Sequence, residues 1–309
     1  MRRAGPPTLP KELISTYISN RGLAFWNWLE DERGFSKEVI EEFELGYAPN
    51  RPMFNVWPSN VENLPRYPRS PGDTVYQNQY QLPGKMASGA AKGGQDTGAS
   101  VAIPIKDSNG LLRGFAARSI SLQRSGKDIG GAKYRRWASA LPPYGASNYK
   151  KLGDKVILVE GYSDLWRLWE AGVYNALAIY GLSGLKSFAS SGSHLGAIEF
   201  TSIVDNKEIW LFMDGDLPGR TATVRHILLL KKAIEAGIIN VTNVYVVIGP
   251  PEKDPGDLSI QEIQSLLDSK PMLGEEYIRW WLSMGIDVAD ITQVSLLNKQ
   301  IDRLFMNNL

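Results

Sequence analysis

The stretch Ile209–Arg220, IWLFMDGDLPGR, joins a short apolar run to two acids and the start of a helical pattern. Residues 209–213 are all apolar, and Asp214 and Asp216 follow them with a single glycine between. A short apolar run bounded by turn residues is typical of a buried strand, and Pro218 in front of a helical pattern is typical of a helix start. A strand that leads directly into a helix indicates an α/β fold, and two acids at its end suggest that something is bound there.

Composition restricts what these acids can bind. The chain has 309 residues, 43% of them hydrophobic and 22% charged, and a formal net charge of +1. It has no cysteine and only two histidines, which excludes disulfides and cysteine-ligated zinc or iron–sulfur sites and disfavours a histidine-rich metal site. A metal here is therefore expected to be a hard cation on oxygen ligands. Since we find no secretory signal and no membrane-spanning run, we expect a cytoplasmic protein with no membrane partner.

The same alternation of strand and helix patterns continues on both sides of this stretch. We expect strands at 156–159, 175–180, 209–213 and 244–248, and helices at 163–172, 184–190 and 218–237. Strands that alternate with helices form a parallel sheet that is covered on both faces. The central part of the chain is therefore predicted to be a parallel α/β sheet.

The flanking regions have other patterns. Residues 8–45 keep helical spacing, residues 84–99 are rich in Gly, Ala and Ser and read as a mobile loop, and residues 101–105 and 111–120 read as a β-hairpin. After Leu258 the chain is predicted to be helical, at 260–267, 275–284 and 291–306. The expected fold class is α/β, with a mixed α/β N-terminal part, the central parallel sheet and a small helical C-terminal region.

Acids follow three of the four predicted strands. They are Glu160 and Asp164 after the first strand, Asp214 and Asp216 after the third, and Asp254 and Asp257 after the fourth. Ligands of open α/β sheets bind at the carboxyl ends of the strands, so we expect these acids at one edge of the sheet. Any one of them could instead be a helix N-cap, and Asp164 is a clear candidate for that role.

The whole set is better explained by a metal site. Converging carboxylates repel one another and raise each other's pKa unless a cation neutralises them. Mg²⁺ prefers one or two carboxylates together with phosphate and water oxygens. Two such ions, about 3.5–4 Å apart, clamp the attacking and leaving oxygens of a phosphoryl transfer. The pattern therefore predicts a divalent-metal site for phosphoryl chemistry.

The acidic motifs resemble a known domain. EGYSD (160–164) followed by DGD (214–216) resembles the TOPRIM domain of DnaG-type primases, type IA and type II topoisomerases and OLD-family nucleases. AGVYNALAIYGLSGL (171–185) and DGDLPGRTAT (214–223) resemble motifs of the primases within that group. Further motifs resemble the primases' upstream segments in the family's order, namely residues 17–49 with an insertion after Leu23, AIPIKDSNGLLRGFAARSI (102–120) and KYRRWASALPPYGAS (133–147).

The resemblance covers about residues 11–260 and implies the RNA-polymerase core of a primase. It implies a basic N-terminal subdomain (1–150), a TOPRIM domain (151–257) and a helical C-terminal subdomain (258–309). The family's N-terminal zinc ribbon and helicase-binding domain are not found, as expected for an excised core or a primase of a phage or mobile element. The family's last acidic motif, Asp-Pro-Asp, stands here as residues 254–257, DPGD: Asp254 matches, and Asp257 is the candidate replacement for the second acid.

A basic segment precedes the predicted parallel sheet. Between Arg113 and Lys151, nine Lys and Arg residues occur with Asp128 as the only acid, and Tyr134, Trp137, Tyr144 and Tyr149 are interleaved with them. Such groups neutralise backbone phosphates and stack on unpaired bases, although a solvated charged face is the simpler reading of the composition alone. By resemblance, the candidates for nucleotide or template binding are Arg118 and Lys133, together with Arg113, Arg135 and Arg136.

The function implied is that of a DNA primase, a nucleotidyltransferase of DNA replication that makes short RNA primers from NTPs on single-stranded DNA. Catalytic roles fall to Glu160, Asp214 and Asp216, with two or more Mg²⁺ or Mn²⁺ ions and no zinc. Implied partners are the DNA template, NTPs, and a replicative helicase or a separate zinc-binding initiation factor. The alternatives are a TOPRIM nuclease and a non-catalytic primase-like module that binds DNA or recruits replication partners. A topoisomerase is disfavoured because no segment resembles its strand-cleaving domain.

Overall fold

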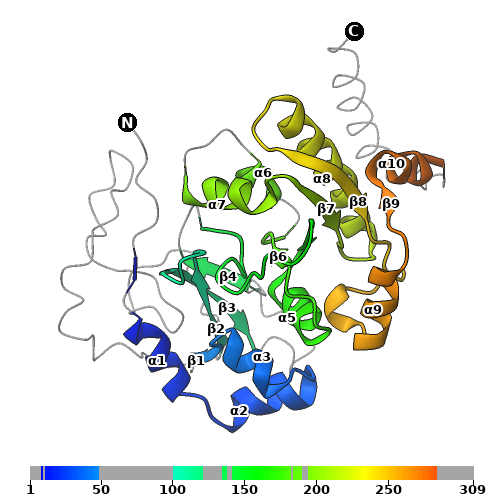
Figure 1. Ribbon diagram of the computed structural model, residues 1–309. Helices are drawn as coiled ribbons and strands as arrows, with labels where there is room; N and C mark the ends of the chain where they lie inside the picture. Colours follow the sequence, from blue (N-terminus) through cyan, green and yellow to red (C-terminus); the bar gives the residue numbers. More distant parts are fainter. Residues whose placement is uncertain are drawn as a thin grey trace, which may run out of the picture. The chain divides into compact units, whose positions relative to one another are not determined.

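The computed structural model describes residues 8–9, 11–48, 100–120, 134–137, 141–181, 184–189 and 194–283 (Figure 1). The predicted loop 84–99 and the predicted helix 291–306 lie outside these residues. The chain divides into two compact units, one of Met1–Asn148 with Ser193–Glu199 and the other of Tyr149–Gly192 with Phe200–Leu309. The three-part division at residues 150 and 257 stays a prediction.

The first unit has an antiparallel sheet with short helices before it. The helices are α1 (Glu12–Ser19), α2 (Leu23–Trp26), the π-helical turn η1 (Asn27–Glu32) and α3 (Lys37–Glu42). The strands, in sheet order, are β1 (Gly46–Ala48), β2 (Ser100–Lys106), β3 (Leu112–Ser119) and β4 (Tyr134–Trp137). The pair β2 and β3 is the predicted hairpin. Helix α1 packs on the sheet through Tyr17, whose ring centroid lies 5.0 Å from that of Phe115.

The second unit has a five-stranded sheet in the order β6-β5-β7-β8-β9 (Figure 1). Its strands are β5 (Lys155–Val159), β6 (Ala176–Ala178), β7 (Lys207–Leu211), β8 (Val241–Val246) and β9 (Met272–Leu273). The first four of these pair in parallel, and β9 pairs with β8 in the antiparallel direction. The predicted parallel α/β sheet is therefore confirmed.

Helices follow the strands as the alternating pattern predicted. They are α5 (Tyr162–Glu170), α6 (Gly184–Phe188), α7 (Leu195–Val204), α8 (Leu217–Glu235), the 3₁₀ turn η3 (Pro255–Asp257), α9 (Ile260–Asp268) and α10 (Gly274–Ser283). None of the helices in the described ranges is long and apolar enough to cross a membrane.

Strand β5 of the parallel sheet is buried on both of its faces. Val156 and Leu158 of β5 pack in a core cluster with residues of β7, α6, α8 and α10, while Ile157 and Val159 point the other way and are also fully buried. A strand that is buried on both faces has an uninterrupted apolar run, and this run allowed β5 to be predicted from the sequence. Such strands hold the residues at their carboxyl ends in fixed positions.

Helix α7 and strand β9 were not predicted. Helix α7 carries Ile198, Thr201 and Val204, and β-branched residues of this kind weaken a helical signal in the sequence. Strand β9 has only two residues, too few to show an alternating pattern, and it interrupts a region that we predicted to be helical throughout. Helices α9 and α10 agree with the remaining prediction for that region.

Candidate metal centre at the carboxyl edge of the parallel sheet

Three neighbouring strands deliver acids to one edge of the parallel sheet. Strands β5, β7 and β8 are adjacent, and Glu160, Asp214 and Asp254 follow them along the chain. Charges on Asp164, Glu160, Asp254 and Asp216 all act on the Asp214 carboxyl group, so the structure brings these five acids together. The side chain of the sixth predicted acid, Asp257, is exposed in the turn η3.

Asp214 lies at the centre of this group. It follows the fully buried Leu211 and Phe212, and its Oδ1 atom is buried without a hydrogen-bond partner. Burial, reinforced by the neighbouring acids Asp164 and Glu160 first, raises the pKa of Asp214 to about 9. A buried acceptor without a donor is costly in a folded protein. A bound cation would remove both the repulsion and the missing contact.

The turn between Asp214 and Asp216 is fastened to the loop that follows β8. The Gly215 N–H donates to the Lys253 carbonyl at 2.9 Å, and the Glu252 N–H donates to the Gly215 carbonyl at 3.2 Å. A Cβ atom at position 215 would lie 2.9 Å from the Lys253 oxygen, so a side chain does not fit there. Position 215 therefore needs glycine for packing against this loop, and not only for the approach of a ligand.

Asp216 begins helix α8 as its N-cap. One of its oxygens, Oδ1, accepts a hydrogen bond from the Gly219 N–H at 2.7 Å, and Pro218 occupies the first turn. The simpler reading of this acid as a helix cap is thus correct for one oxygen atom. Oδ2 is not used by the cap. An N-cap fixes the rotamer of its side chain, so Asp216 is held beside Asp214 in a defined orientation.

Glu160 and Asp164 surround the end of strand β5. The Glu160 carbonyl accepts a hydrogen bond from the Gly181 N–H at 2.9 Å, which joins the loop after β6 to this edge. Asp164 is 4% exposed, and its two oxygens accept backbone N–H bonds from Gly161 and Gly256 at 2.7 and 3.1 Å. Asp164 therefore has a different environment from Asp214, although both lie in the same group of acids.

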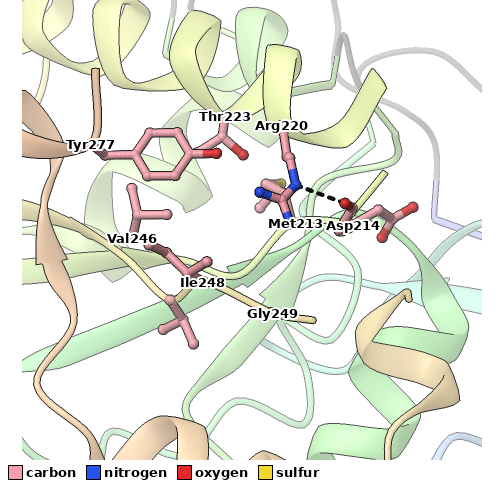
Figure 2. Close-up of a pocket in the computed structure, with 10 residues that line it drawn as sticks. Met213, Asp214, Arg220, Thr223, Val246, Ile248, Gly249 and Tyr277 are labelled. Atoms are coloured by element: carbon pink, nitrogen blue, oxygen red, sulfur yellow. Dashed lines mark hydrogen bonds between the residues drawn. The ribbon is translucent and has the colours of Figure 1, made fainter. Parts of the chain in front are cut away.

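A small pocket opens beside Asp214. It is lined by Met213, Asp214, Gly215, Arg220, Thr223, the segment 246–249 and Tyr277. Figure 2 shows Arg220 reaching down from α8, where its Nε–H donates to the Gly215 carbonyl at 2.7 Å, with Thr223 and Tyr277 farther along the pocket. Burial raises the pKa of Tyr277, whose hydroxyl is hydrogen-bonded to Thr223.

Arg220 was not among the predicted site residues. It is the only basic side chain in the pocket lining, and its bond to Gly215 holds the turn between the two acids. The signal that could have identified it is its place in the first turn of a helix that begins at an acid, since a cation is disfavoured at a helix N-terminus and needs another reason to be there.

The donor set fits a hard divalent cation. Every candidate ligand is a carboxylate, and Asp214 offers an oxygen atom with no other partner. In the described part of the chain, no three acids or histidines are already arranged as a cage around one point. Mg²⁺ takes one or two protein carboxylates and completes its shell with water and phosphate oxygens.

The predicted basic residues lie in the first unit, and two of them have internal partners. Arg113 donates from Nε to Asp107 Oδ2 at 2.6 Å and from Nη1 to the Thr8 hydroxyl at 2.9 Å. Arg118 is 4% exposed, and its guanidinium lies 5.7 Å from the centre of the Trp28 ring. The other three are Arg135 and Arg136 on β4, whose backbone pairs with Ala117 and Ala116, and Lys133, which lies outside the described residues.

Comparison with known proteins agrees with this arrangement. Residues 154–242 match the Toprim domain family. The DNA primase of Aquifex aeolicus is 30% identical over 259 residues, a match that covers 80% of this chain and 45% of the relative. The chain is homologous to the DnaG-type primases. It spans less than half the length of the curated primases that it matches.

Solved primase structures share the fold of this homologue. The RNA polymerase domain of Mycobacterium tuberculosis primase DnaG matches with a TM-score of 0.58 at 18% identity, over 96% of each chain. A DnaG primase catalytic domain bound to single-stranded DNA matches with a TM-score of 0.51 at 16% identity, over 90% of this chain and 82% of that one. Toprim primases generally depend on divalent metal ions, so the acidic edge lies where the fold predicts such a site.

Proposed function

We propose that the chain is the catalytic core of a DNA primase, which joins NTPs into short RNA primers on a single-stranded DNA template. The observation that carries this proposal is the unpartnered, buried oxygen atom of Asp214 among four further acids, in a homologue of the primases. A degenerate domain without catalysis would gain nothing from this group, because uncompensated buried carboxylates destabilise the folded state.

Asp214, Asp216, Glu160 and Asp254 are the residues that would hold Mg²⁺ or Mn²⁺, with two or more ions at the edge of the sheet. Bound divalent ions supply Lewis-acid stabilisation of the phosphoryl oxygens and of the leaving group. The buried β7 strand and the N-cap bond of Asp216 keep the two central carboxylates fixed, so that little reorganisation is needed during the reaction. No zinc enters this proposal.

The reaction is a nucleotidyl transfer. The primer 3′-oxygen attacks the α-phosphorus of the incoming NTP, a new P–O bond forms, and the bond from the α-phosphorus to the bridging oxygen breaks to release pyrophosphate. The proton of the 3′-hydroxyl goes to a base, for which Glu160 is one candidate and water the other. The protein's part is to position the reactants and to stabilise the developing charge.

The basic residues of the first unit are proposed to hold the template and the triphosphate. The candidates for this role are Lys133, Arg135, Arg136, Arg113 and Arg118, of which the last two also contact Asp107 and Trp28. Affinity for single-stranded DNA should then fall steeply with salt. A replicative helicase or a separate zinc-binding initiation factor would act as partner. Because the template is DNA, we place the protein in the cytoplasm, at the nucleoid or the replication fork.

The test is NTP- and metal-dependent synthesis of oligoribonucleotides on single-stranded DNA, run both de novo and from an annealed primer. Asp214→Ala should reduce both activities by about 10³-fold or more, since it removes the central carboxylate. Asp268→Ala is the matched control, because Asp268 is exposed at the end of α9. Full activity of Asp214→Ala would refute the assignment, and metal-dependent nicking of DNA without NTPs would favour the nuclease.

A further inference from the structure

Asp164 links two segments of the chain that are far apart in sequence. Its Oδ2 accepts the Gly161 N–H at 2.7 Å, which closes the turn from β5 into α5. Its Oδ1 accepts the Gly256 N–H at 3.1 Å, from the turn η3, which is 92 positions later in the chain. The side chain is 4% exposed, so these two bonds form away from water.

Asp164 and Asp214 have opposite environments within the same group of acids. Both oxygens of Asp164 accept backbone hydrogen bonds, whereas Oδ1 of Asp214 is buried with no partner. A carboxylate that accepts charge-assisted backbone bonds is already stabilised in the metal-free protein. A buried carboxylate oxygen without a donor is not, and this is the group that gains most from a cation.

Position 256 has no room for a side chain. A Cβ atom there would lie 2.8 Å from Asp164 Oδ1 and 3.4 Å from the carbonyl carbon and the Cβ of Ser163. The Gly256 carbonyl in turn accepts a bond from Arg167 Nε at 3.4 Å. The turn η3 is therefore packed directly against α5, and an acid at position 256 would displace it.

We propose that Asp164 is a positioning residue rather than a metal ligand. Together with Gly256 it forms a clamp (the Asp164–Gly256 clamp) that holds the turn η3 against α5. Asp254 immediately precedes that turn, and its carbonyl accepts the Asp257 N–H at 2.9 Å. The clamp thereby sets the position of Asp254 beside Asp214. The inference rests on the proposed function in one respect, namely that Asp214 and Asp254 share a divalent cation.

The most specific test of the clamp is a variant that changes no acidic residue. Gly256→Ala should push the clamp apart, move Asp254 and weaken Mn²⁺ binding about tenfold, as loss of supporting contacts around a metal site does. Gly22→Ala is the matched control, since Gly22 is exposed and a Cβ atom there would meet nothing nearer than the Asn20 carbonyl oxygen at 3.9 Å. Binding is measured from the electron paramagnetic resonance signal of free Mn²⁺, with no nucleotide or DNA present.

A second measurement uses the metal-free protein. Asp164→Asn should lower Tm by about 3 °C, because the amide loses the negative charge and one of its two acceptor oxygens. Asp214→Asn should raise Tm instead, because it removes a carboxyl group that has a buried oxygen atom with no hydrogen-bond donor. The two acids are thus expected to have effects of opposite sign, which a common role as ligands does not predict.

Two results would overturn the clamp. One is Mn²⁺ binding by Gly256→Ala as tight as that of the unmodified protein, and the other is an Asp164→Asn variant that melts at or above the unmodified protein. Lack of Mn²⁺ binding by the unmodified chain would overturn the proposed metal site and the positioning role with it. The melting comparison would still decide whether the clamp holds α5 and η3 together, so the two failures are distinguishable.

Discussion

The two units of this chain present charged residues in different ways. In the second unit, acids follow the strands β5, β7 and β8 of a parallel sheet, and five of them meet at its carboxyl edge. In the first unit, arginines lie along strands of an antiparallel sheet. There Arg113 pairs with the buried Asp107, and Arg118 stacks on Trp28. At the acidic edge, Asp214 keeps a buried oxygen atom without a hydrogen-bond partner, whereas Arg113 and Arg118 both have partners within the fold.

The difference follows from backbone geometry. A residue that follows a parallel strand lies outside the sheet's hydrogen-bond ladder, so the strand sets its position and its side chain lies at the edge where such sheets bind ligands. A residue within a strand points to one face or the other, and its partners depend on what covers that face. The following predictions test whether this contrast is real, from the largest expected effect to the smallest.

Asp214 should make the metal-free protein sensitive to pH. Its pKa is raised to about 9 in the folded state, against about 3.9 for an ordinary aspartate. Its ionisation therefore favours the unfolded state, and the free energy of unfolding should fall as pH rises, by up to about 4 kcal/mol between pH 5 and pH 8. Urea titrations in EDTA measure this slope.

The same titrations on Asp214→Asn provide the comparison. The variant should lose most of the slope, and Mg²⁺ should stabilise the unmodified protein more at pH 8 than at pH 5. A free energy of unfolding that does not change over this range would show that burial and the neighbouring acids do not raise the pKa of Asp214.

Arg113→Ala should destabilise the first unit by about 3 kcal/mol. The Asp107 side chain is 1% exposed, and loss of its Arg113 partner would leave a buried charge uncompensated. Chemical denaturation measures the change, with Arg225→Ala on the exposed side of α8 as control. If the main role of Arg113 is to bind the template, the variant will instead bind single-stranded DNA more weakly while its stability is unchanged.

Arg118→Ala should cost about 2 kcal/mol of stability, through lost packing and the lost stacking on Trp28. Arg118→Lys should recover only part of it, since an ammonium group lacks the flat guanidinium surface. Thermal unfolding of both variants gives the comparison. A raised KM for NTP with unchanged Tm would place Arg118 among the nucleotide contacts instead.

Asp257→Asn should have the smallest effect. Asp257 is exposed, so we expect Mn²⁺ affinity to change by less than about twofold and stability by less than about 0.5 kcal/mol. A loss of Mn²⁺ affinity comparable to that of Asp214→Asn would show that Asp257 is one of the metal ligands.

The acidic edge could be predicted from the sequence because apolar runs that are typical of strands precede the acids. What could not be predicted depends on distant partners. Asp257 lies only one position after Gly256, yet the 3₁₀ turn leaves it exposed. The roles of Gly256 and Asp164 depend on a contact across 92 positions, which no local pattern reveals.

One of the two arginine contacts could have been predicted from a local pattern in the sequence. Asp107 and Arg113 flank the turn of the β2–β3 hairpin, and opposite charges on either side of a hairpin turn often pair. The burial of Arg118 has no such signal, because Trp28 comes from the helical region at the start of the chain. Local pairing is thus open to prediction from sequence, while pairing between distant segments is not.

Strand β9 has a practical consequence for work on isolated fragments. The Toprim match ends at residue 242, inside β8 (Val241–Val246). A fragment cut there would lose most of β8 and all of β9, and would leave β7 as an open edge that invites association between copies. A fragment that ends after α10, at Ser283, keeps β8 complete and its outer edge paired, and is therefore the shorter piece that we expect to remain monomeric.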